Sequence, residues 1–512
     1  MGDTTAGSRL RGPFGELRPL AAALTLGFGL SLSPTTYAAT FTVTNLNDSG
    51  AGSLRDAINQ ANITAGADTI NFTVTGTITL TTGALSIQDD VTITGPGAAS
   101  LTVVPTANYV AFYLTDSNPT VTISGLTIQG NGGTNSNDGG AIASHYSGNL
   151  TVQNSVISGN KTSGRGGAIY NYAGTVNIVN SVLTGNQAGG KGGAIYNGDG
   201  NVNITNSTVS GNTATGGGAI FSNYGAVSFV GSTVSGNQAS GTPGSSGGAL
   251  YATNGSVTIQ NSTFSGNTTF YDGGALWTRY APVTITNSTF SGNVAQEGGG
   301  GAVAFEYATI NLVSTILANS QDIAGTRDLF QFTVGVPGVN GHHRTPATHK
   351  TNTSTRHAGK VKVRRAPHAA GMPHTSIMPV NATNSLIENT GGFLNGTNVN
   401  NIIGQDPALG PLANNGGPTL THALLAGSPA IDKGSNPNAL AFDQRGTPFV
   451  RTSGAQTDIG AFEVQGAAPP PPPVTALDIP TLSQWGTIIL SGLLGIWAAI
   501  TGFGRRRKSD GS

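Results

Sequence analysis

The sequence predicts an all-β protein, a right-handed single-stranded parallel β-helix whose coils are each about 25 residues long. Two motifs predict it: Asn-Ser-Thr-Phe-Ser-Gly-Asn at 261–267 and Gly-Gly-Ala-Leu-Trp at 273–277. Versions of both recur with one shared period, which indicates a stacked repeat. The last Asn of the first motif falls at Asn131, Asn160, Asn186, Asn212, Asn237, Asn267, Asn293 and, more weakly, Asn319. The Ala of the second falls at Ala141, Ala168, Ala194, Ala219, Ala249, Ala275 and Ala302.

Composition supports this fold and excludes several classes of protein. Glycine accounts for 77 of 512 residues without a triplet period, so the chain is not a collagen. Only 9% of residues are charged, and the body carries more acidic than basic residues, so no nucleic acid is expected as a partner. There is no cysteine, which excludes disulfides, thiolate metal sites and thiol catalysis. We assign no cofactor and no metal.

Residues 1–38 are predicted to be a signal peptide, because three arginines precede the apolar run 20–32 and small residues follow it. Cleavage is expected after Ala38, so the export machinery is an expected partner. The strand pattern of 41–44 then opens the β-helix. Ser53 begins a capping box, and Leu54, Ala57, Ile58 and Ala61 share one helical face. We predict a capping helix there, covering the first end of the stack.

Within the repeat, each coil is predicted to contain three short strands and three corners. The residue three before the Asn is apolar, and the residue after the Ala is aliphatic, so each forms a column of stacked side chains. Asn suits tight turns and hydrogen-bonds to its neighbour in such a stack. The apolar positions are Ile128, Ile157, Leu183, Val209, Val234, Phe264, Phe290 and Ile316.

These motifs carry a family resemblance. Phe264 to Asn267 with Gly273 to Leu276, and the corresponding residues 290–293 and 301–303, resemble the paired FxxN and GGA[ILV] repeats of polymorphic outer-membrane proteins. The other coils depart from that pattern, with Val, Ile or Leu in place of Phe. The resemblance implies a β-helix on a cell surface and does not imply one particular activity.

The β-helix is expected to occupy residues 39–401, interrupted at about 321–382. Inside that insertion, residues 341–374 hold six of the eight histidines and seven basic residues. Two interpretations are open: a loop that binds metal or polyanions, and a disordered surface insertion. The histidines show no i, i+4 spacing with a nearby carboxylate, which favours the second.

Residues 402–464 resemble the "choice-of-anchor" module that follows β-helices in bacterial surface proteins. The resemblance rests on the order of 412–419, 427–432, 443–446 and 458–463. Its polar residues invite an active-site interpretation, but we expect them to fix turns and to close the lower end of the stack as a cap. They are His422, Asp432, Asp443 and Arg445.

A Pro-rich linker at 465–478 leads to a tripartite tail at 479–508. Its motif is Ile479, Pro480, Thr481, Leu482, Trp485 and Gly486, and its basic stop is Arg505, Arg506, Arg507 and Lys508. Between them, the apolar run 487–503 is just long enough for a transmembrane helix with the basic cluster left in the cytoplasm. The tail resembles an IPTL-type sorting signal, which implies processing by an exosortase-like membrane protease. A plain membrane anchor is the alternative.

One aromatic follows the Gly-Gly-Ala motif at the same offset in five coils: Tyr170, Tyr196, Phe221, Tyr251 and Trp277. Strand alternation places these rings opposite the aliphatic column. We expect an exposed ladder that binds a glycan or a surface protein; the alternative is that the rings point inward or are covered. Arg165 and Lys191 precede Gly-Gly-Ala in adjacent coils and are expected to stack without a carboxylate beside them.

Three functions compete. The first is a non-enzymatic adhesin or matrix component, exported to the cell envelope, outer-membrane surface or medium after transient inner-membrane anchoring. The second is a polysaccharide lyase or glycoside hydrolase, and the third is a spacer. Enzymes on this fold need clustered charged groups, and the repeat has few; Asp272 is a candidate only if loops bring others to it. The first function is therefore preferred, with the ligand and the oligomeric state left open.

Overall fold

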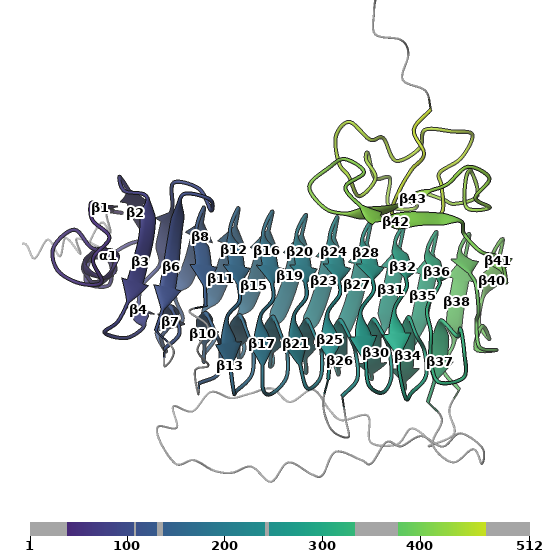
Figure 1. The fold of residues 1–512 in the computed structure, drawn as a ribbon, viewed down its shortest axis with the longest axis horizontal. Helices are drawn as coiled ribbons and strands as arrows, with labels where there is room; N and C mark the ends of the chain where they lie inside the picture. The colour runs from purple at the N-terminus through teal and green to yellow at the C-terminus, as the bar shows by residue number, and fades with distance from the viewer. Residues whose placement is uncertain (1–37, 107–108, 131–136, 241–244, 333–376, 467–512) are drawn as a thin grey trace, which may run out of the picture. The chain divides into compact units, whose positions relative to one another are not determined.

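A computed structural model describes residues 38–106, 109–130, 137–240, 245–332 and 377–466. The chain is mostly β and forms a parallel β-solenoid of about 11 turns (Figure 1). The predicted signal peptide up to residue 37, most of the predicted insertion, and nearly all of the predicted linker and sorting tail lie outside the described residues. In the part of the chain that is described, no helix is long and apolar enough to cross a membrane.

Three long sheets run along the solenoid, and neighbouring strands in each pair in parallel. The first has 13 strands. They are β1 (Thr40–Val43), β2 (Asp68–Phe72), β5 (Val91–Thr94), β8 (Thr120–Ser124), β11 (Asn149–Gln153), β15 (Thr175–Val179), β19 (Asn201–Thr205), β23 (Ala226–Val230), β27 (Ser256–Gln260), β31 (Val283–Thr286), β35 (Ile310–Val313), β38 (Val380–Thr383) and β40 (Asn398–Val399).

The second sheet has 12 strands. They are β3 (Gly76–Leu80), β6 (Leu101–Pro105), β9 (Thr127–Gln129), β12 (Val156–Ser158), β16 (Val182–Thr184), β20 (Thr208–Ser210), β24 (Thr233–Ser235), β28 (Thr263–Ser265), β32 (Thr289–Ser291), β36 (Ile316–Ala318), β39 (Leu386–Ile387) and β41 (Ile402–Ile403).

The third sheet has 10 strands, which carry the residues after Gly-Gly-Ala. They are β4 (Leu85–Ile87), β7 (Phe112–Leu114), β10 (Ile142–Ser144), β14 (Ile169–Asn171), β18 (Ile195–Asn197), β22 (Ile220–Ser222), β26 (Leu250–Thr253), β30 (Leu276–Arg279), β34 (Val303–Glu306) and β37 (Leu329–Gln331).

A fourth, short sheet was not predicted. Its six strands have two residues each and follow the Asn corner. They are β13 (Lys161–Thr162), β17 (Gln187–Ala188), β21 (Thr213–Ala214), β25 (Gln238–Ala239), β29 (Thr268–Thr269) and β33 (Val294–Ala295).

The Asn corner forms the predicted side-chain ladder. From Asn160 to Asn293, each Asn is buried, and each Nδ2 from Asn160 to Asn267 donates to the Oδ1 of the Asn in the next coil at 2.9–3.0 Å. The ladder ends there, because the register pairs Phe290 with Leu317 and not with Ile316. Ser320 therefore takes the Asn position in that coil, and Asn319 lies at the exposed surface. The prediction that Ile316 continues the apolar column was wrong by one residue.

The main core lies inside the coils. It contains the aliphatic column that follows Gly-Gly-Ala, the Ala column itself, and the alternate residues of the other two sheets. Helix α1 (Leu54–Ala61) begins where the capping box predicts, with Ser53 Oγ accepting a hydrogen bond from the Asp56 amide at 3.1 Å. Its four predicted apolar residues are buried, and the helix packs against β1, β2 and β4.

Residues 402–464 do not close the lower end of the stack as predicted. β42 (Leu409–Ala413) and β43 (Thr421–Leu424) form an antiparallel pair that lies across the outer face of the 12-stranded sheet (Figure 1). The chain from 402 to 466, named here the flank module, bonds to successive coils: Thr419 to Gly231, Gln444 to Thr263 and Ala461 to Thr289. The last strands of the stack remain exposed at Val399 and Ile403.

The flank module packs along the outer face of the 12-stranded sheet because that face is apolar near the end of the solenoid. Ile316, Ala318 and Leu386 point outward there and form a separate hydrophobic cluster with Leu424, Ala430 and Ile459 of the module. Burying these side chains favours docking along the sheet.

Candidate functional site: the aromatic column and the tyrosine rim

The five predicted aromatics form one continuous stack on the outside of the 10-stranded sheet. The register pairs Tyr170 with Tyr196, Tyr196 with Phe221, Phe221 with Tyr251, and Tyr251 with Trp277. Successive ring centroids lie 5.2, 5.4, 4.7 and 4.3 Å apart, with interplanar angles of 26° or less. The predicted alignment of these rings is therefore confirmed. We call this stack the aromatic column.

The prediction that the aromatic column is exposed was wrong. Trp277 is 0% exposed, Tyr170 is 3% and Tyr251 is 9%; Phe221 is also buried and Tyr196 is half-buried. Because strands repeat at about 4.8 Å, each ring covers both faces of its neighbours. Phe330, Phe332 and Phe393 pack against the same cluster from residues beyond the repeat. The column is an outer hydrophobic core, and its ring faces are closed to a ligand.

Two cations cover the edge of the column. The Arg165 guanidinium lies 4.6 Å from the Tyr196 ring centroid, and the Lys191 ammonium lies 4.1 Å from that of Phe221. Contrary to prediction, a carboxylate lies beside one of them: Asp138, one coil earlier, pairs with Arg165 at 2.6 Å. Arg165 also donates to the Tyr196 hydroxyl at 3.1 Å. These contacts fix Arg165 as part of the packing.

His145 extends the column where a ring is missing. The small side chain of Ala143 occupies the column position between Tyr113 and Tyr170. The imidazole of His145 fills this gap, with its centroid 5.7 Å from Tyr113 and 4.7 Å from Tyr170. Burial lowers the pKa of His145, opposed by the nearby Asp138. The sequence pattern does not predict this role, because His145 lies two residues after Ala143, which occupies the column position.

Loops do bring other carboxylates near Asp272. Asp272 Oδ1 accepts a hydrogen bond from the Gly299 amide at 2.9 Å, and Asp322 Oδ2 accepts one from Gly300 at 3.1 Å. Burial raises the pKa of Asp272 to about 7 despite that hydrogen bond, and the charges of Asp322 and Glu306 add to the shift. Asp322 pairs with Arg327 at 2.8 Å. The carboxylates therefore hold the glycine turn at 298–301.

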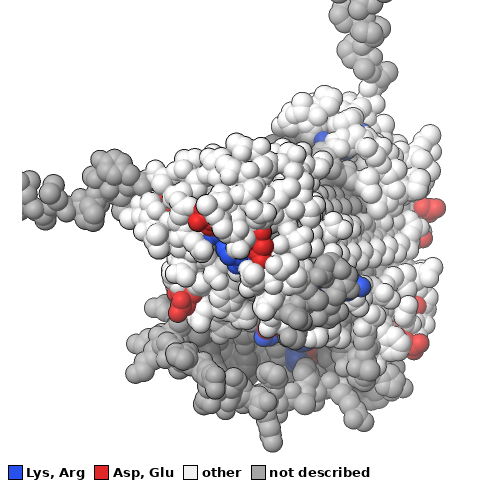
Figure 2. All heavy atoms as spheres, turned by 60° about the vertical axis from the view of Figure 1, so that its left-hand side comes forward, with Lys and Arg blue, Asp and Glu red and all other residues white. Residues whose placement is uncertain are grey.

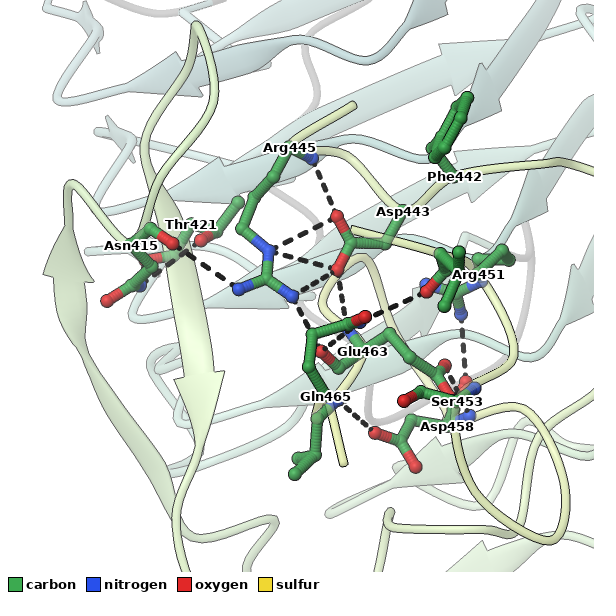
Figure 3. A network of polar contacts seen from close by, with 12 residues as sticks. Asn415, Thr421, Phe442, Asp443, Arg445, Arg451, Ser453, Asp458, Glu463 and Gln465 are labelled. Atoms are coloured by element: carbon green, nitrogen blue, oxygen red, sulfur yellow. Dashed lines mark hydrogen bonds and ion pairs between the residues drawn. The ribbon is translucent and has the colours of Figure 1, made fainter. Parts of the chain in front are cut away.

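The polar residues of the flank module form a closed network (Figure 3). Arg445 pairs with Asp443 at 2.6 Å and donates to the Glu463 carbonyl at 2.6 Å. Its guanidinium lies between the rings of Phe449 and Phe462, 3.8 Å from each centroid. Asp432, in turn, donates its amide to Asp458 at 2.8 Å. These groups bond to one another, as expected for a scaffold that fixes turns, whereas Nε and Nη1 of the buried Arg451 in the same network have no hydrogen-bond partner.

His422 connects the flank module to the solenoid. Its Nδ1 lies 2.8 Å from the Gly410 carbonyl, and its Nε2 lies 2.9 Å from Ser265 Oγ. A carbonyl only accepts, so Nδ1 carries the proton and Nε2 accepts from the serine hydroxyl. A serine nucleophile and its base have the same arrangement, but His422 and Ser265 are both only 8% exposed, in the interface. The contact therefore holds the flank module against the solenoid.

A second set of aromatic residues is exposed, and the sequence interpretation missed it. Tyr146, Tyr172, Tyr224 and Tyr280 are 36–40% exposed, and each lies at the corner between the 10-stranded and 13-stranded sheets. Tyr307, which is only 8% exposed, stacks on Tyr280 with ring centroids 5.0 Å apart. We call these five residues the tyrosine rim. A signal was available: four of them lie five residues after the Ala of Gly-Gly-Ala, and Tyr172 lies four after it.

The corner beneath the rim is rigid. Asn171 Nδ2 donates to the Gly174 carbonyl and to Asn197 Oδ1, both at 2.7 Å, and Asn197 repeats the first contact with Gly200 at 2.6 Å. The corner glycines pack backbone on backbone: a Cβ on Gly200 would lie 1.9 Å from the Gly174 oxygen. Only glycine fits there, so the corner has one closely packed conformation.

Two rim residues have unusual backbone angles. Tyr280 and Tyr307 have φ values of 55° and 51°, in the left-handed region. Asn254 takes φ 57° at the same corner one coil before Tyr280, as expected for a residue that tolerates this region. A tyrosine there costs about 1–3 kcal/mol of strain. The corner thus presents tyrosine where asparagine or glycine would be more stable.

Two motif families match parts of the chain. The Chlamydia polymorphic membrane protein repeat matches residues 154–172 and 180–198, which are two coils of the solenoid. The IPTL-CTERM motif matches residues 479–507. Neither match covers residues 402–464, so the choice-of-anchor resemblance rests on its sequence pattern alone. No curated protein matches the chain. The matched motifs imply an exported surface protein and a sorting protease of the exosortase type that processes it.

Proposed function

We propose that this chain is a non-enzymatic adhesin or matrix component, displayed on the cell envelope, that contacts its ligand through the tyrosine rim. The β-solenoid with polymorphic-membrane-protein repeats and the IPTL-CTERM motif support display at the surface. The observation that carries the binding role is the tyrosine rim, in which four of the five side chains are exposed along one closely packed corner. Scattered exposed aromatics are ordinary, whereas several that recur along one corner of successive coils indicate an interaction surface.

The proposal includes the finer features of the fold. The solenoid is right-handed, α1 covers its first end, and the tail at 479–508 is an IPTL-type signal cut near Ile479 to Gly486 by an exosortase-like protease. The apolar run 487–503 anchors the chain in the inner membrane only until that cleavage. Before it, the signal peptide is removed after Ala38.

The experiment follows the chain in its host. Cells are fractionated, and the carboxyl terminus of the surface form is mapped by mass spectrometry. A surface form that ends near the IPTL motif supports the proposal, and retention of the intact chain in the inner membrane contradicts it. Binding of the surface form to a glycan array and to host cells then tests the adhesin role.

A polysaccharide-acting enzyme is the second candidate, and one observation favours it: Asp272, with its pKa raised to about 7, lies near Asp322 and Glu306. General acids in glycoside hydrolases have such raised pKa values. Depolymerisation of any polysaccharide by the chain, lost in Asp272→Asn, would establish this function and overturn the first. The charged pairs Asp138–Arg165, Glu306–Arg279 and Asp322–Arg327 support the non-enzymatic proposal, because each carboxylate has a structural partner.

A further inference from the structure

We propose that the tyrosine rim binds an extended neutral polysaccharide that lies parallel to the solenoid axis; this inference rests on the proposed function. The ligand would contact Tyr172, Tyr224 and Tyr280 in turn. The described surface supports the orientation, because the exposed rings are distributed along the stack and not around one coil.

The spacing of the rim suits a linear polymer. Coils repeat at about 4.8 Å. Tyr172 lies two coils from Tyr224, and Tyr224 lies two coils from Tyr280, so consecutive contacts recur at about 10 Å. This interval is comparable with the length of one disaccharide unit in an extended glycan. A chain of sugars therefore presents an apolar ring face to each tyrosine in turn, which a compact ligand cannot do.

The charge of the rim favours a neutral glycan over an acidic one. Arg279, the cation beside Tyr280, is already paired with Glu306 at 3.0 Å. Asp199 occupies the rim position one coil before Tyr224. A uronate or sulfated chain on this corner would meet a carboxylate and no unpaired cation among the described rim residues. Charged side chains are few over the described surface in view in Figure 2.

Hydrogen-bonding groups lie beside the rings. In the coils that neighbour those of Tyr172, Tyr224 and Tyr280, the strands of the 13-stranded sheet begin with Asn149, Asn201 and Ser256, and all three are exposed. Amides and hydroxyls next to an aromatic surface are the groups that bind sugar hydroxyls while the ring packs against the sugar's apolar face. The rigid corner reduces the ordering cost of binding, because its backbone does not rearrange.

The left-handed backbone conformation of Tyr280 and Tyr307 also supports a binding role for the rim. Strained residues persist only where the surrounding structure enforces them, and they cluster at functional sites. The buried Tyr307 ring stacks on Tyr280 and supports its exposed ring, at the end of the row nearest the flank module.

The test measures binding of the full chain to three neutral linear hexasaccharides (cellohexaose, laminarihexaose and mannohexaose) and to hexagalacturonate, by isothermal titration calorimetry. The double variant Tyr224→Ala/Tyr280→Ala removes two rim contacts. Tyr109→Ala is the matched control, because Tyr109 is 42% exposed in the turn before β7, at a different corner. We expect at least one neutral hexasaccharide to bind, with a Kd raised 10-fold or more in the double variant and less than 2-fold in the control.

Each other result overturns the inference. Preference for hexagalacturonate would show that the ligand is acidic, an unchanged Kd in the double variant would place the site elsewhere, and no binding to any neutral chain would exclude this ligand class. Circular dichroism of both variants verifies that the solenoid is intact. Host-cell adhesion by a chain that fails this test leaves the proposed function standing, whereas depolymerisation of a hexasaccharide contradicts that function as well.

Discussion

Replacing Asn212 with alanine removes the centre of the buried Asn ladder. The Asn212 side chain donates to Asn237 Oδ1 at 2.9 Å and to the Leu183 carbonyl at 3.0 Å, and it accepts from the Asn186 amide and Nδ2 at 2.9 and 3.0 Å. Asn212 is 0% exposed, so water cannot replace these bonds without disturbing the coil. Each buried group left without a partner costs about 1–3 kcal/mol. With the Leu183 carbonyl and the Asn186 amide both unpaired, we expect a loss of roughly 3–5 kcal/mol.

The assay is urea unfolding of the chain, followed by circular dichroism. Asn201→Ala is the control, because Asn201 lies in the same coil at an exposed position and accepts one bond, from the Ala226 amide at 3.0 Å. Water can replace that bond, so a loss under about 1 kcal/mol is expected. If Asn212→Ala lowers the free energy of unfolding no more than Asn201→Ala does, the ladder does not hold the coils together and the reasoning fails.

Three further predictions concern the column, the buried acid and the flank module. Trp277→Ala should lower the free energy of unfolding by about 3–5 kcal/mol, against under about 1 kcal/mol for exposed Tyr224→Ala; equal losses in thermal denaturation would contradict the burial of the column. Because the native pKa of Asp272 is raised to about 7, the native state binds more protons than the unfolded state above pH 4, so stability should fall as pH rises from about 4 to 7. Asp272→Asn should flatten that pH profile, and a profile identical to wild type would refute the assignment. Arg445→Met leaves Asp443 buried without its cation and should cost about 3–5 kcal/mol. Limited proteolysis should then cut the flank module first, and cleavage within the coils before the module would contradict this.

The repeat made the solenoid predictable, because the Asn and Gly-Gly-Ala motifs recur at the same spacing in successive coils. The aliphatic column, the Asn ladder and the face of α1 all follow from local periodicity, and the structure confirms them. The one-residue shift of the apolar position from Ile316 to Leu317 was not predicted, because the sequence of one coil alone does not fix its register with the coil before it. There, the pairing of Phe290 with Leu317 decides it.

The site was harder to predict than the fold. Strand alternation correctly placed Trp277 outside the coil, but it does not tell whether that outer side is covered. Coverage depends on ring spacing across coils and on Phe330 and Phe393, which come from beyond the repeat. The tyrosine rim also had a sequence signal, four or five residues after the Ala of Gly-Gly-Ala. The sequence interpretation instead selected the aromatic two residues after that Ala, which belongs to the aromatic column. The position of the flank module depends on contacts such as Gln444 with Thr263, 181 residues apart, which no local pattern reveals.

The flank module also has a consequence for the order in which the chain matures. A solenoid can form coil by coil from its first residues as they are synthesised, since each coil needs only its neighbour. The outward Ile316, Ala318 and Leu386 stay uncovered until residues 424–459 arrive and dock on them. The interval between the two is the period in which the half-made chain is prone to aggregate. Because the covering segment is made after all the coils, a chain cut before residue 424 keeps these apolar side chains exposed and remains recognisable to chaperones and proteases.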